Sequence, residues 1–209
     1  MIKKIKQIIK PEAEQSEDKK VILLDPAAIS GPSEPDMRIV GLFADVNEEK
    51  IAEILHNMLF FNEINIQNPK KALPITFYIS TYGGNADDMF AMYDMMRNIR
   101  ESSEIHTVGL GKVMSAGVLM LAAGTKGQRY VGKNCRVMIH SVMGGNHGSL
   151  HNMINEMEAI EQLQDMYCDA LIAETKLTRA KLKKMLERKV NVYLSAEEAV
   201  ELGIADEII

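Results

Sequence analysis

A serine and a histidine stand where two predicted strands end, 25 positions apart along the chain. Ser115 lies within GLGKVMSAGVLMLAAG (109–124), where nearly every other side chain is small or apolar, and His140 ends RVMIH (136–140). A histidine can take the proton of a serine hydroxyl, whose oxygen then attacks a carbonyl carbon. The pair indicates acyl transfer. Taken singly, each residue has a simpler interpretation, Ser115 as a helix N-cap and His140 as a hydrogen-bonded structural side chain.

A diglycine turn follows a third predicted strand. Gly83 and Gly84 come directly after ITFYISTY and precede a helix. Glycine allows the backbone to turn so that its N–H groups face a substrate, and such donors stabilise the oxyanion of acyl transfer. Many strand-to-helix turns carry glycines for geometry alone. However, ligands of open α/β sheets bind beyond the carboxyl ends of the strands, where this turn, Ser115 and His140 would all lie.

Two further histidines have the spacing of a metal-binding pair. His147 and His151 are separated by Gly148, which interrupts the helix that such a pair needs, and no Glu follows His147 as in the H-E-x-x-H motif. We therefore predict no metal and no cofactor.

The elements that must position these residues alternate along the chain. Strands are predicted at 21–24, 37–43, 74–80, 104–111 and 136–140, and helices at 47–61, 86–100, directly after Ser115, at 148–176 and at 195–203. Asn47 is a predicted N-cap, and Ser195 with Glu198 forms a predicted capping box. Alternation of strands and helices predicts an α/β fold with a mainly parallel sheet. The apolar stripe from Leu150 to Leu171 is long enough to suggest packing against another subunit.

Composition narrows the class of protein. The net charge is -5 and no basic stripe is present, which argues against a nucleic-acid partner. The longest uncharged apolar run, 113–124, is too short to span a bilayer, so no membrane association is predicted. Two cysteines make no disulfide framework, and reduced thiols in the cytoplasm are the simplest interpretation. The N-terminal MIKKIKQIIK is predicted to be a mobile basic tail or a short amphipathic helix.

The chain resembles the proteolytic subunit of the Clp protease from about Met37 to Ile209. The matching stretches are ISTYGG, GLGKVMSAGVLMLAAG, TKGQRYVGKNCRVMIHS, GGNHG and YLSAEEAVELGIAD. This resemblance implies one crotonase-like α/β head domain over 37–209, with a protruding handle helix around 141–176, preceded by a mobile or axial segment, 1–36. It also implies stacked heptameric rings that enclose a chamber, into which an ATP-dependent AAA+ unfoldase feeds unfolded polypeptides.

The resemblance assigns a role to each site residue. Ser115 is the expected nucleophile and His140 the expected general base, while the amides of Gly84 and Ala116 form the expected oxyanion hole. Substrate is expected to bind as an added strand along three residues, Gly83, Asn85 and Met143.

Three departures from the family pattern leave alternatives open. Asn191 stands where the family has a catalytic aspartate; an amide can orient the histidine but cannot stabilise its positive charge. Asn98 replaces an aromatic residue of the unfoldase docking pocket, and segment 1–36 does not resemble the family's axial loops. A weakly active or non-catalytic subunit of a mixed ring is therefore the alternative. An acyl-CoA enzyme of the same fold would need an acidic base near the diglycine, for which only Asp87 and Asp88 are candidates.

Overall fold

The computed structural model describes residues 37–145, 147–187 and 191–209. The predicted strand at 21–24 and the rest of segment 1–36 lie outside them. The strands are β1 (Ile39–Leu42), β2 (Ile75–Thr81), β3 (Ile105–Met114), β4 (Arg129–Val131), β5 (Arg136–Ile139), β6 (Val192–Leu194) and β7 (Glu207–Ile208). The α-helices are α2 (Glu48–Gln67), α3 (Ala86–Ile99), α4 (Ala116–Ala122), α5 (Leu150–Glu174), α6 (Arg179–Leu186) and α7 (Ala196–Glu201), and a 3₁₀ turn covers Pro69–Lys71.

All these strands join one sheet, and β3 divides it. The order β1-β2-β3-β4-β7 is parallel throughout. The first half of β3 pairs with β4 and its last three residues pair with β5, again in parallel. Only β6, which pairs with β5, is antiparallel. The predicted α/β class with a mainly parallel sheet is therefore confirmed.

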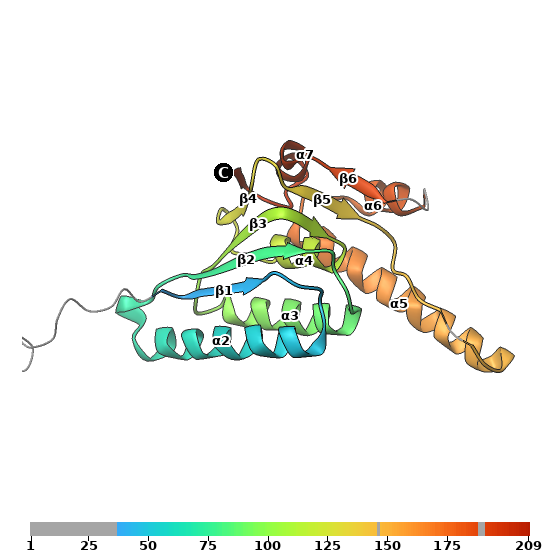
Figure 1. Ribbon diagram of the computed structural model, residues 1–209, viewed down its shortest axis with the longest axis horizontal. Helices are drawn as coiled ribbons and strands as arrows, with labels where there is room; N and C mark the ends of the chain where they lie inside the picture. Colours follow the sequence, from blue (N-terminus) through green and yellow to red (C-terminus); the bar gives the residue numbers. More distant parts are fainter. Residues whose placement is uncertain (1–36, 146, 188–190) are drawn as a thin grey trace, which may run out of the picture. The chain divides into compact units, whose positions relative to one another are not determined.

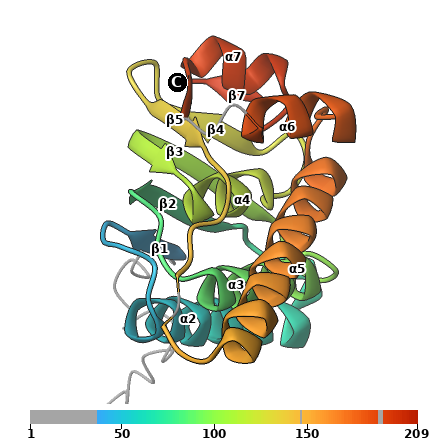
Figure 2. The same cartoon turned by 90° about the vertical axis from the view of Figure 1, so that its right-hand side faces the viewer.

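Helices cover the sheet and form the core with it. Figure 1 shows α2 and α3 along one side of β1 and β2, and Figure 2 shows α4 between the strands and α5. Along β2, alternate side chains such as Phe77 and Ile79 are fully buried. Every residue of α4 is buried, which explains why this helix has no polar surface.

Helix α2 begins where predicted but ends later than the apolar pattern suggested. The Asn47 side chain accepts from the Lys50 amide (3.0 Å), so the predicted N-cap is confirmed. The helix then continues to Gln67 through two buried asparagines. The Ser103 hydroxyl donates to Asn62 (2.6 Å) and accepts from Asn65 (2.8 Å). Buried polar residues that are satisfied in this way break the apolar periodicity without ending the helix.

Helix α5 is buried at one end and exposed at the other. Ser149 caps it, and Tyr167, Cys168, Ala170 and Leu171 near its C-terminus belong to the core. Its N-terminal half runs out beyond the sheet (Figure 1) and carries exposed apolar side chains: Leu150, Met153, Ile154 and Met157. The predicted stripe is thus core along one part of the helix and open surface along the other.

Several short elements in the second half of the chain were not predicted. Helix α6 and strands β4, β6 and β7 are too short to show a hydrophobic period, so tertiary contacts define them.

The capping box of α7 was predicted and is confirmed, because the Ser195 amide donates to the Glu198 carboxylate (2.8 Å) and the Glu198 amide donates to the Ser195 hydroxyl (3.2 Å). Among the described residues, no helix is both long and apolar enough to cross a membrane.

A buried carboxylate ties the end of α5 to α3 and to the turn before β4. The Glu174 side chain is only 6% exposed and forms ion pairs with Arg100 (2.7 Å) and Lys126 (2.8 Å). Burial alone would raise the pKa of Glu174. The hydrogen bonds and charges of Arg100 and Lys126 outweigh burial and bring it down to about 2.

Arg129 extends this network to the C-terminal segment. Its guanidinium donates to the Glu174 carbonyl oxygen (2.7 Å) and forms an ion pair with Asp206 (2.6 Å). Asp206 also accepts from the Gly127 amide (2.7 Å). Burial would raise the pKa of Asp206, but Arg129 holds it below its ordinary value. The charged cluster therefore joins α3, the end of α5, β4 and the segment before β7, which are far apart in sequence.

Candidate active site

Ser115 occupies a strained turn between β3 and α4. Its backbone has φ 54° and ψ -121°, and no other non-glycine residue of the described ranges has a positive φ. Such a conformation costs on the order of 1–3 kcal/mol and persists only where the surroundings enforce it. Here the Ser115 amide donates to the Met138 carbonyl (2.8 Å), and the Ser115 carbonyl accepts from the Tyr167 hydroxyl (3.1 Å). Ser115 holds the N-cap position of α4, as the simpler interpretation predicts, but its side chain makes no capping bond.

In the sequence, Tyr167 stands out only as part of the apolar stripe from Leu150 to Leu171. Burial raises the pKa of Tyr167, so its hydroxyl stays protonated and remains a donor. It reaches Ser115 from 52 positions along the chain. No local pattern could have assigned it this role.

The diglycine turn presses against the serine. A Cβ on Gly83 would lie 2.6 Å from the Ser115 Cβ, so no side chain fits there, and φ is +100°. Val46 holds the residues on both sides of Gly84. Its amide donates to the Gly83 carbonyl oxygen (2.8 Å), and its own carbonyl oxygen accepts from the Asn85 amide (2.9 Å). Within the described ranges the Gly84 N–H itself has no protein acceptor. It remains free for a ligand, as does the N–H of Ala116 in the first turn of α4.

His140 follows β5 and is half-buried. Its Nδ1 lies 2.6 Å from the carbonyl oxygen of Ser141. Because a carbonyl oxygen only accepts, Nδ1 carries the hydrogen, and Nε2 is left able to accept a proton. This is the tautomer that a general base toward a serine hydroxyl requires.

One cleft of about 430 Å³ brings most of the predicted residues together. They are Ser115, Ala116, His140, Gly84, Asn85 and Met143. Gly83 lies close to Ser115 but outside this lining. Asp87, which the sequence offered as a candidate acidic base near the diglycine, also lines the cleft. The sequence had not assigned the following lining residues to the site: Tyr82, Met89, Glu156, Ile160, Leu163 and Tyr167.

Asn191 lies outside this cleft lining and is exposed. Strands β5 and β6 pair Ile139 with Val192, so the next step of this antiparallel register would set His140 opposite Asn191. In the described part of the chain, however, no hydrogen bond joins Asn191 to His140, whose Nδ1 pairs with Ser141. The role of Asn191 remains a prediction.

A family model of the Clp protease matches residues 35–209, which include every residue described in the structure. The chain belongs to the Clp protease family. The resemblance found in the five sequence stretches is confirmed. Clp protease subunits are serine peptidases that act inside a proteolytic chamber, and the strained Ser115 turn beside His140 agrees with that chemistry.

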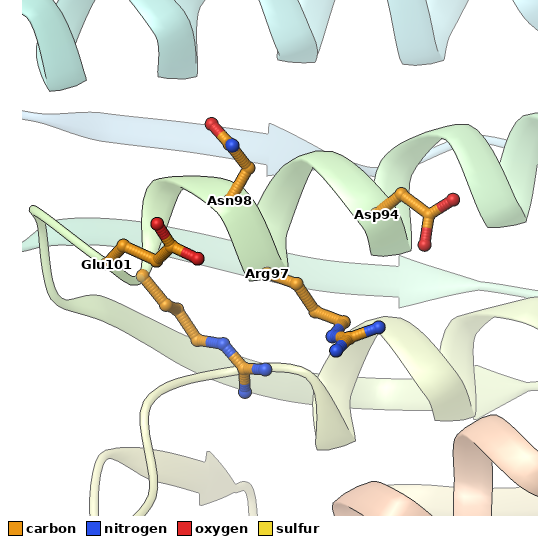
Figure 3. Close-up of a pocket in the computed structure, with 5 residues that line it drawn as sticks. Asp94, Arg97, Asn98 and Glu101 are labelled. Atoms are coloured by element: carbon orange, nitrogen blue, oxygen red, sulfur yellow. The ribbon is translucent and has the colours of Figure 1, made fainter.

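A second hollow of this Clp protease subunit lies on α3, about 440 Å³ in volume. Figure 3 shows it with Asp94, Arg97, Asn98 and Glu101 labelled, and Arg100 completes the lining. Asn98, the residue predicted to replace a docking aromatic, is exposed and points away from Arg97. The lining is polar throughout and lacks a nucleophile, so this hollow is no second peptidase site.

No group of three or more His, Cys, Asp or Glu side chains that could hold a metal ion occurs in the described residues.

Proposed function

We propose that this chain is a serine endopeptidase that cleaves unfolded polypeptides. The observation that carries the proposal is the shared cleft of Ser115 and His140, with Ser115 held in a strained turn and with Nε2 of His140 free to accept. His140 takes the Ser115 proton while Oγ attacks the substrate carbonyl. The amides of Gly84 and Ala116 stabilise the resulting oxyanion. His140 then gives the proton to the leaving amine, and water releases the acyl group in a second, similar step.

Substrate binds as an extended strand in this proposal. Gly84 and Asn85 line the cleft, and so does the segment after His140, including Met143. That segment lies against α5, because the Val142 amide donates to Gln164 (2.6 Å). Main-chain pairing with both stretches would recognise unfolded chains with little regard to sequence.

We further propose that the N-terminal half of α5 is the handle and joins stacked rings of seven subunits. Its exposed apolar side chains support this assembly, because contiguous apolar surface usually marks an interface. An AAA+ unfoldase would supply substrates by ATP hydrolysis. The polar surroundings of Asn98 favour weak docking by rings made of this chain alone.

A serine-reactive fluorophosphonate tests the nucleophile. Wild-type protein should be labelled and Ser115→Ala should not, whereas Ser80→Ala should label normally because Ser80 is half-buried in β2 outside the cleft. Unchanged labelling of Ser115→Ala would refute the assignment.

A second candidate function is a weakly active or non-catalytic subunit of a mixed ring. It is favoured by Nδ1 of His140, which pairs with a backbone carbonyl rather than with a carboxylate. Under this candidate, fluorophosphonate labels Ser115 only slowly, and co-expression with a related subunit gives mixed rings by native mass spectrometry.

A further inference from the structure

Helix α5 holds the backbone beside both the proposed nucleophile and the proposed base. The Tyr167 hydroxyl donates to the Ser115 carbonyl oxygen (3.1 Å), and the Gln164 side chain accepts from the Val142 amide (2.6 Å). Gln164 and Tyr167 are three positions apart, so they are neighbours on the surface of one helix. The first contact holds the turn of the nucleophile, and the second holds the segment that follows His140.

The Val142 amide belongs to the same peptide unit that bonds His140. The carbonyl oxygen of this unit, that of Ser141, lies 2.6 Å from Nδ1 of His140, and its N–H donates to Gln164. Because a peptide unit is planar, an acceptor that fixes the direction of the N–H also fixes the direction of the carbonyl. Gln164 is therefore linked to the histidine through one peptide unit.

The bond to Gln164 also makes the Ser141 carbonyl a better acceptor. A peptide whose N–H donates is polarised, and its oxygen becomes more negative. When His140 takes the proton of Ser115, its ring becomes positive, and the bond from Nδ1–H becomes the stronger, charge-assisted kind. A fixed and polarised carbonyl therefore stabilises the positive ring better than a carbonyl that is free to turn.

The side-chain amide of Gln164 has one orientation that satisfies its neighbours. The Val142 N–H requires an oxygen, and the NH₂ group then donates to the sulfur of Cys168 (3.3 Å), which is buried in the core. Leu163 lines the cleft, but Gln164 does not. An effect of Gln164 on the reaction must therefore pass through the peptide and not through contact with substrate.

From this arrangement we infer that Gln164 is a positioning residue of the peptidase site. Through the peptide unit after Ser141, it holds His140 in the tautomer that accepts a proton at Nε2. The inference rests on the proposed peptidase function and adds a residue on which the rate of that reaction depends.

Substitutions that keep the length of the Gln164 side chain test this role. Fluorophosphonate labelling of Ser115 depends on the serine and its base and requires no bound peptide strand. Gln164→Met removes the acceptor and should slow labelling by roughly three- to tenfold, the range for one neutral hydrogen bond. Gln164→Glu keeps an acceptor oxygen and should label within about twofold of the wild-type rate. Gln162→Met is the matched control and should label normally, because Gln162 is exposed on the same helix outside the cleft lining.

Peptide hydrolysis separates positioning of the base from support of the substrate strand. In Gln164→Met, kcat should fall by the same factor as labelling while KM stays unchanged. A raised KM with normal labelling would mean that Gln164 only supports the strand-binding segment, and this result overturns the inference. Equal slowing by Gln164→Met and Gln164→Glu also overturns it, because the acceptor would then be irrelevant. Gln164→Ala likewise lacks the acceptor and gives the same comparison if Gln164→Met does not fold.

The wild-type result keeps this inference distinct from the proposed function. If wild-type protein is labelled and folded Gln164→Met is labelled at the same rate, the positioning role is wrong and the peptidase function stands. If wild-type protein is neither labelled nor able to cleave peptides, the peptidase function is wrong, and the positioning role is wrong with it.

Discussion

Replacing Glu174 by glutamine should destabilise the protein in a pH-dependent way. The carboxylate is buried between Arg100 and Lys126, and its pKa falls from 4.5 to about 2. A shift of that size corresponds to about 3 kcal/mol of stability at neutral pH. Glutamine keeps the shape of the side chain but removes the charge, so Glu174→Gln should lose most of this amount. For a domain of this size the loss corresponds to roughly 6–12 °C in Tm.

The sign of the pH dependence follows from the lowered pKa. The stabilisation is complete above about pH 5 and is lost as pH falls from 4.5 toward 2, because the unfolded chain then binds the proton more readily. The Tm difference between wild type and Glu174→Gln should therefore narrow to about half its neutral value near pH 3.

Thermal unfolding followed by circular dichroism at a fixed protein concentration measures this difference from pH 7 to pH 3. Glu161→Gln is the matched control, since Glu161 is exposed on the same helix. A Tm gap near zero at pH 7, or one that stays constant down to pH 3, would contradict the account of the charged cluster.

Three more predictions concern the cleft and the assembly. Gly83→Ala would place a Cβ 2.6 Å from that of Ser115, and it should lower the rate of fluorophosphonate labelling by roughly 100-fold without changing the oligomer. Asn191→Asp should raise peptide turnover about tenfold or more if this residue orients His140; an unchanged kcat would mean that the Ser141 carbonyl is the sole partner. The double variant Ile154→Glu/Met157→Glu should dissociate the assembly, as measured by sedimentation velocity. Wild-type protein that is monomeric at micromolar concentration would refute the predicted interface.

Local patterns in the sequence were enough to predict the main elements. The Asn47 cap and the Ser195 capping box depend on residues close together in the chain, and the parallel sheet was predicted from alternating strand and helix patterns; all three are confirmed. The place of Ser115 between a strand and a helix follows from the same patterns.

The features that were missed depend on contacts between distant segments. The backbone strain at Ser115 is held by Met138 and Tyr167, and neither contact leaves a trace in the sequence near the serine. The hydrogen bond from His140 to the adjacent Ser141 carbonyl depends on how the chain leaves β5. Residues of α3 and α5 line one cleft only because the fold brings these two helices together.

The divided strand β3 has a consequence for how this site tolerates change. Met114 of β3 is paired with Met138 of β5, and Ser115 and His140 follow these two positions closely. A backbone ladder, and not the chain that loops between them through α4 and β4, therefore fixes how far apart the two side chains stand. Residues added in the turn before β5 would lengthen the interval in sequence and leave the chemistry in place. A shift of β5 by one residue in its register with β3 would turn His140 to the opposite face of the sheet. The site would then lose its activity, although every side chain would still be present.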